Sequence, residues 1–136
     1  MVLRTWNDCK YQGFTKEISI DNDLISSLII ASKNKQLSES LLPLNKITSS
    51  SKISLAYDSL RILLESLSIS KGYKIYNHEC YFAFINSILN KPELANEFNR
   101  IRKIRNSINY YGFELVLNKV ENLLSDIYSL IKSLNN

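Results

Sequence analysis

Residues 53–67 read ISLAYDSLRILLESL, and the helical pattern of the chain becomes sharp in this stretch. Its apolar residues recur three and four positions apart, so they line one broad face of a helix. They are Ile53, Leu55, Ala56, Leu60, Leu63, Leu64 and Leu67. We expect a helix over residues 52–71 that ends near Lys71 and Gly72, because glycine readily adopts the left-handed conformation that terminates many helices.

Helical spacing also marks the segments on both sides of this stretch. Asp21 and Asp23 precede the first of them, where acidic side chains suit a helix N-terminus. Asn77 can cap another, and Pro92 suits a first helical position because it has no N–H to leave unpaired. The expected helices cover residues 22–37, 77–90, 92–111 and 113–133.

Length and composition favour one all-α domain. The chain has 136 residues, which suits a single core, and its three glycines and two prolines are few for a fold with many tight turns. We therefore expect residues 1–136 to form one up-and-down bundle of four to five helices. Residues 1–20 would be an arm that packs through Trp6, Tyr11 and Phe14, and the serine-rich stretch 38–51 would be a connection within the domain.

Charge, cysteine content and hydropathy also limit the ligands and the cellular location that we expect. The formal charge of +4 permits contact with nucleic acid without requiring it. Cys9 and Cys80 stand far apart without metal-ligand spacing, so we expect two reduced cysteines, Cys80 as a small buried hydrophobe, and no metal or cofactor. The first ten residues lack a signal-peptide core, and no apolar run approaches the roughly 20 residues that span a bilayer. These features predict a soluble, cytoplasmic protein without membrane contact.

The helix expected over 92–111 carries the candidate functional residues. Four of the chain's seventeen basic residues fall within positions 100–105. Arginine offers a fork of donors that matches phosphate, and tyrosine offers a flat surface on which a base can stack. A basic flank on a helix is more often only a solvated face. The pattern indicates an RNA- or nucleotide-binding stripe formed by Arg102, Arg105, Asn106 and Asn109, together with Tyr110 and Tyr111.

Arg105-Asn106, followed by a short spacer and an aromatic pair, resembles the signature of the HEPN (higher eukaryotes and prokaryotes nucleotide-binding) superfamily. Gly72-Tyr73, Asn77-His78-Glu79 and a helix bearing Tyr57, Asp58 and Arg61 add to the resemblance, which covers residues 50–132. It implies a helical bundle that pairs as a homodimer through the 92–111 helix. It further implies a metal-independent endoribonuclease of a toxin–antitoxin or defence system, a partner of a nucleotidyltransferase, or a non-catalytic RNA-binding unit.

Catalytic members of that superfamily carry arginine, four to six residues, and then histidine. Here a four-residue spacer from Arg105 leads to Tyr110, and a six-residue spacer from Arg102 leads to Asn109. Tyrosine, with a pKa near 10, is a poor base at neutral pH. The chain therefore resembles a divergent prokaryotic-type member without the motif histidine, which favours binding or partnership over catalysis. Arg105, Asn106 and Tyr110 are the candidates for a catalytic role in a non-standard ribonuclease site.

His78 is the only histidine in the chain. It could supply the missing base only if the 77–90 helix brought it close to Arg105. A lone histidine at a helix start is more often a cap or a hydrogen-bonding residue at the edge of the core, and we favour that interpretation.

Overall fold

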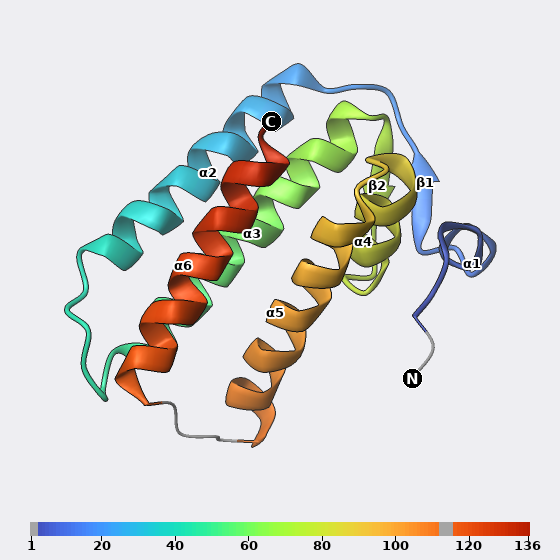
Figure 1. Ribbon diagram of the computed structural model, residues 1–136. Coiled ribbons are helices and arrows are strands. Elements are labelled where there is room, and N and C mark those ends of the chain that lie inside the picture. Colours follow the sequence, from blue (N-terminus) through green and yellow to red (C-terminus); the bar gives the residue numbers. More distant parts are fainter. Residues whose placement is uncertain (1–2, 112–115) are drawn as a thin grey trace.

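Helices make up most of the chain. The computed structural model describes residues 3–111 and 116–136, except for the side chains of residues 109–111. The prediction of an all-α bundle is confirmed, with the addition of a small two-stranded sheet (Figure 1). In chain order the elements are α1 (Trp6–Tyr11), β1 (Thr15–Glu17), α2 (Asn22–Ser40), α3 (Ser49–Ser70), β2 (Tyr73–Ile75), α4 (Cys80–Ala83), the π-helix η1 (Phe84–Ile88), α5 (Pro92–Tyr111) and α6 (Leu117–Leu134).

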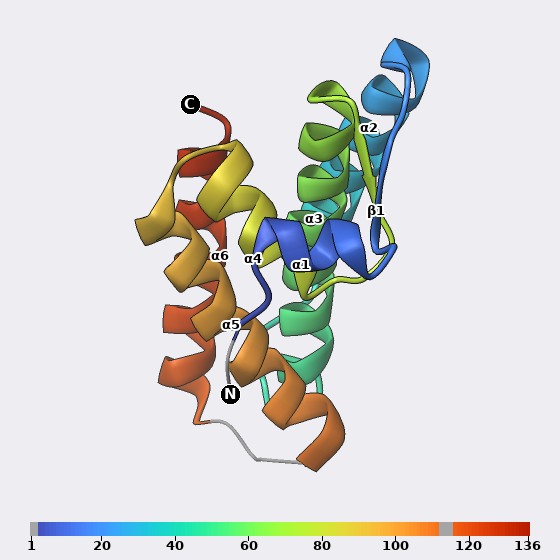
Figure 2. The same cartoon turned by 90° about the vertical axis from the view of Figure 1, so that its right-hand side faces the viewer.

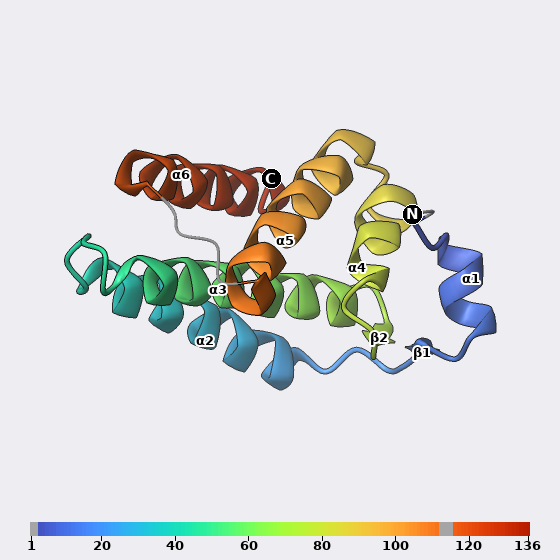
Figure 3. The same cartoon turned by 90° about the horizontal axis from the view of Figure 1, so that it is seen from below.

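The helix that contains residues 53–67 lies at the centre of the bundle. α2 packs along one side of α3 and α6 along another, as Figure 3 shows from below. Ala56, Leu60 and Leu64 of α3 are fully buried. They belong to one connected core that includes Phe84, Phe98 and Ile127 of the later helices. Burial of these apolar side chains is the main force that gathers the helices around α3.

Local signals set most of the helix boundaries. The Asp21 carboxylate accepts a hydrogen bond from the backbone N–H of Leu24 at 3.0 Å, and Pro92 is the first residue of α5. Gly72 follows α3 with a φ of 86°. The helix expected over 77–90 is shorter than predicted, because Asn77 accepts from the Glu79 N–H at 2.9 Å and closes a turn before α4 begins.

Polar contacts, and not a continuous apolar face, anchor α2. The helix predicted over 22–37 is present, but its residues Ile30 and Leu37 are 60% and 62% exposed. The buried Ser32 hydroxyl donates to the Ser59 carbonyl of α3 at 2.7 Å. Near the other end of α2, the Lys52 ammonium lies 2.6 Å from the buried Glu39 carboxylate. A buried ion pair of this kind fixes the register between α2 and α3 because neither charge can be left unpaired.

The strands β1 and β2 form an antiparallel ribbon that the sequence analysis did not predict. Thr15 pairs with Ile75, Lys16 with Lys74, and Glu17 with Tyr73. The ribbon joins the N-terminal arm to the end of α3, and Figure 2 shows α1 lying across the side of the bundle in front of α3 and α4, with β1 beside it. Three-residue strands are too short to give a periodic sequence signal.

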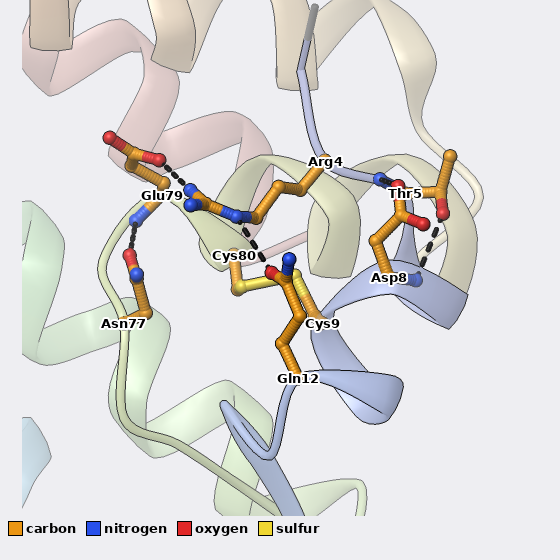
Figure 4. The surroundings of a disulfide bond; sticks show 8 residues. All are labelled: Arg4, Thr5, Asp8, Cys9, Gln12, Asn77, Glu79 and Cys80. Atoms are coloured by element: carbon orange, nitrogen blue, oxygen red, sulfur yellow. Dashed lines mark hydrogen bonds and ion pairs between the residues drawn. A yellow bond between two sulfur atoms is a disulfide. The ribbon is translucent and has the colours of Figure 1, made fainter.

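A disulfide joins Cys9 to Cys80, so the expectation of two reduced cysteines is wrong. The two Cα atoms lie 6.1 Å apart, within the usual range, and both residues are fully buried (Figure 4). The bond links α1 to the first residue of α4 across 71 positions of sequence. The two cysteines meet because the ribbon brings the arm to α4. Their spacing in the sequence could not reveal this pairing.

No helix within residues 3–111 and 116–136 combines the length and hydropathy needed to cross a membrane. The same residues contain no group of three or more histidine, cysteine or acidic side chains that could hold a metal ion.

Reduction of the disulfide should lower the free energy of unfolding by about 2–4 kcal/mol, because the unfolded chain regains the entropy of a long open loop. Urea denaturation with and without reductant measures the difference. The variant with both Cys9→Ala and Cys80→Ala is the control, since reductant should leave its denaturation midpoint unchanged. Equal midpoints for the reduced and oxidised wild-type protein would contradict the prediction.

Candidate functional site

A pocket of about 550 Å³ opens where three segments of the fold meet. Its volume falls in the range of sites that take a small molecule or one unit of a polymer. α3, the segment between β2 and α4, and α5 each form one wall. The lining residues are Tyr57, Arg61, Tyr76, Asn77, His78, Glu79, Arg102, Arg105 and Asn106. We call this site the arginine pocket, because its charged residues within the described part of the chain are three arginines and one glutamate.

Aromatic stacking orients Arg105 inside the pocket. The guanidinium carbon of Arg105 lies 5.0 Å from the centroid of the Tyr57 ring, in cation–π geometry. Tyr57 is itself buried and stacks on Phe98 with 6.4 Å between ring centroids. Burial raises the pKa of Tyr57, while the charges of Arg105 and Arg102 act in the opposite direction. The tyrosine therefore stays neutral and serves as a platform for the cation.

Arg102 is also oriented by a neighbour on its own helix. One guanidinium nitrogen of Arg102 donates to the Asn99 side-chain oxygen at 3.0 Å. Arg102 and Arg105 lie one turn apart on α5, so both guanidinium groups reach the same pocket. The α5 wall therefore presents two cations whose directions are restrained before any ligand arrives.

Arg61 and His78 contact each other within the pocket. Nη1 of Arg61 lies 3.3 Å from Nε2 of His78, and Nη2 lies 3.7 Å from a carboxylate oxygen of Asp58. A guanidinium can only donate, so Nε2 of His78 must be the acceptor. This assigns the neutral imidazole with its proton on Nδ1.

The surroundings of His78 favour that neutral form. Partial desolvation against the pocket wall lowers the pKa of His78, and the charges of Arg61 and Arg105 lower it further. Glu65 and Asp58 oppose these effects to a smaller extent. At neutral pH the imidazole is therefore uncharged and can accept a proton.

The N-terminal arm holds the rim of the pocket. Arg4 forms an ion pair with Glu79, donates to the Gln12 side-chain oxygen at 3.0 Å, and lies 5.3 Å from the Phe14 ring centroid. Figure 4 shows the Arg4 side chain between Gln12 and Glu79, beside the disulfide. The Cys9–Cys80 disulfide and the Arg4–Glu79 pair thus tie the 77–80 segment to the N-terminal arm. The pair also offsets the negative charge of Glu79, which would otherwise repel an anion from the pocket.

The structure brings together part of the predicted site. Arg102, Arg105 and Asn106 line the pocket as one group. Asn109, Tyr110 and Tyr111 lie in the last turn of α5, and their side chains fall outside the described part of the chain. The role of Tyr110 as a replacement for the motif histidine therefore stays a prediction.

His78 lies in the same pocket as Arg105. This is the arrangement that His78 would need to replace the missing motif histidine. Its hydrogen bond with Arg61 also fits the structural role that we favoured from the sequence. Tyr76 is a pocket residue that sequence reasoning missed. The only signal near it was the run from Gly72 to Glu79, noted for its family resemblance.

No protein-family model, curated protein or solved structure matches this chain. The resemblance to the HEPN superfamily therefore rests on the quoted motif residues.

Because His78 is the only histidine, its imidazole signals in a proton NMR spectrum are unambiguous. We expect them to titrate with a pKa below 6.5, and Arg61→Met should raise that pKa because it removes both a cation and a donor to Nε2. Arg100→Met is the matched control, since Arg100 pairs with Glu97 and Asp126 outside the pocket. A wild-type pKa at or above 6.5 would refute the neutral, desolvated histidine.

Proposed function

We propose that the protein is an RNA- or nucleotide-binding module of HEPN type, with the arginine pocket as its phosphate site. The observation that carries the proposal is the convergence of Arg61, Arg102 and Arg105, from two helices, on one open pocket. Guanidinium groups match phosphate oxygens in a two-pronged geometry, and charge-assisted bonds of this kind are strong. Tyr57 and Asn99 orient the Arg105 and Arg102 side chains before a ligand binds. This supports the proposal, because the arginines lose less conformational freedom on binding.

Uncharged polar groups beside the arginines fit the same ligand. Asn77 and Asn106 each add an amide that can both donate and accept, as base edges and ribose hydroxyls require. A site for a purely inorganic anion would need only donors. The mixture therefore favours a nucleotide over a bare phosphate ion.

Arg105→Ala should weaken binding of single-stranded RNA by at least about tenfold, since it removes a charge-assisted bond. Fluorescence anisotropy with a labelled RNA octamer measures the dissociation constant at several salt concentrations. The slope of log affinity against log salt should fall by about 0.7 for each phosphate that the variant no longer neutralises. Arg100→Ala is the control, because it removes the same charge from the same helix outside the pocket. Equal weakening in both variants would mean that only net charge matters.

The position of His78 favours metal-independent RNA cleavage as a second candidate function. A neutral imidazole beside three arginines could take the proton of a ribose 2′-hydroxyl. The 2′-oxygen would then attack phosphorus, the bond to the 5′-oxygen would break, and water would protonate the departing oxygen. The hydroxide that this leaves would take the proton from the His78 imidazolium and restore the neutral imidazole. The lone pair of Nε2 faces Arg61 in this structure, so Arg61 must first turn toward the phosphate.

If the protein cleaves RNA, total RNA incubated with it in the presence of a chelator should yield fragments with 2′,3′-cyclic phosphate ends. His78→Gln should abolish cleavage while RNA binding persists, because the amide keeps a polar group but cannot act as a base. Cleavage that survives in His78→Gln would assign the activity to other residues or to a contaminant. Intact RNA at high protein concentration would leave binding as the function.

The remaining parts of the proposal follow from the family resemblance. They are homodimerisation through α5, a nucleotidyltransferase as partner, and a role in a toxin–antitoxin or defence system. Light scattering tests the first, since a monomer at high concentration would exclude it. A cytoplasmic location also stays a prediction, and the Cys9–Cys80 disulfide removes the argument that cysteine usage gave for it.

A further inference from the structure

Cationic and aromatic side chains continue from the arginine pocket onto the outer face of the ribbon. Lys16 and Lys74 stand directly opposite each other in the strand register, and both are exposed. Residues paired in this way project from the same face of a sheet. Tyr76 lies two residues beyond Lys74, whose Nζ is 5.8 Å from the centroid of the Tyr76 ring. Tyr76 also lines the pocket, so the three residues form a continuous strip, which we call the ribbon strip.

The charge arrangement of the ribbon strip is unfavourable for the protein alone. Like charges directly opposite on neighbouring strands destabilise a sheet, and this sheet has only two short strands. Within the described ranges, no carboxylate lies within ion-pair distance of Lys16 or Lys74. A bound anion would relieve the repulsion between the two lysines.

The aromatic member of the ribbon strip is open to solvent. Tyr76 is 56% exposed, although the neighbouring strand residues Tyr73 and Ile75 pack toward the core. Its backbone N–H donates to the Phe14 carbonyl at 2.8 Å, which fixes its place at the end of the ribbon. An exposed, positioned ring between cations is the arrangement on which the bases of a single strand stack.

We propose that the ribbon strip is the path of a single RNA strand as it leaves the arginine pocket. One phosphate lies on the arginines, its base stacks on Tyr76, and the next phosphates lie on Lys74 and Lys16. Lys74 and Tyr76 are about 6.6 Å apart along the strand, so successive units of an extended chain can reach both. A duplex does not fit, because its bases are already stacked on one another. This inference rests on the proposed function of the pocket and extends it from one nucleotide to several.

Two probes separate the ribbon strip from the pocket: adenosine 5′-monophosphate and a labelled single-stranded RNA octamer of adenosines. The Lys16→Ala, Lys74→Ala double variant should bind the octamer about tenfold more weakly and the mononucleotide as the wild type does. Its salt slope for the octamer should fall by about 1.4, at about 0.7 per phosphate. Tyr76→Ala should weaken both probes, and Tyr76→Phe should restore them because the stacking surface returns.

The matched control is Lys33→Ala with Lys132→Ala, which removes two charges from exposed positions on α2 and α6. The inference is overturned if this control weakens octamer binding as much as the Lys16, Lys74 variant does. It is also overturned if a polyglutamate peptide competes as well as RNA, since the ribbon strip would then be a general anionic surface. If the Lys16, Lys74 variant aggregates but binds the octamer normally, the lysines only protect a sheet edge. If Arg105→Ala changes neither probe, the proposed function of the pocket fails instead.

Discussion

The burial of α3 holds the other elements of the fold together. Leu60 and Leu64 are fully covered, and α2, α6, α5 and β2 all pack against this one helix. The middle of α3 also supplies Tyr57 and Arg61 to the pocket. Because Tyr57 is a buried residue of this central helix, core packing holds the ring over which the Arg105 guanidinium lies.

The helices could be predicted because their signals are local. Apolar spacing over 53–67, the Asp21 cap and Pro92 at the start of α5 each act within one or two turns of chain. The disulfide and the ribbon could not be predicted for the opposite reason. Cys9 meets Cys80, and Lys16 meets Lys74, across roughly half of the sequence, and neither pairing leaves a periodic pattern.

The same distinction between local and distant contacts applies to the residues of the candidate site. Arg102, Arg105 and Asn106 could be grouped from helical geometry, since they share one face of α5. Whether His78 would join them depended on where the 76–79 segment lies, and the ribbon, the disulfide and the Arg4–Glu79 pair together decide that. Tyr76 could not be identified from the sequence, because its place in the pocket depends on α3 and α5, which are distant from it along the chain.

The arm also carries a spectroscopic reporter. Trp6 is the only tryptophan in the chain, and its ring lies 5.1 Å from Tyr73 and 6.2 Å from Phe84, measured between centroids. It is 9% exposed at the junction of α1, β2 and the π-helix. Tryptophan fluorescence therefore comes from this one junction, and its wavelength reports whether water reaches the Trp6 ring. A red shift at constant helical circular dichroism would report undocking of the arm alone, as a local opening distinct from global unfolding.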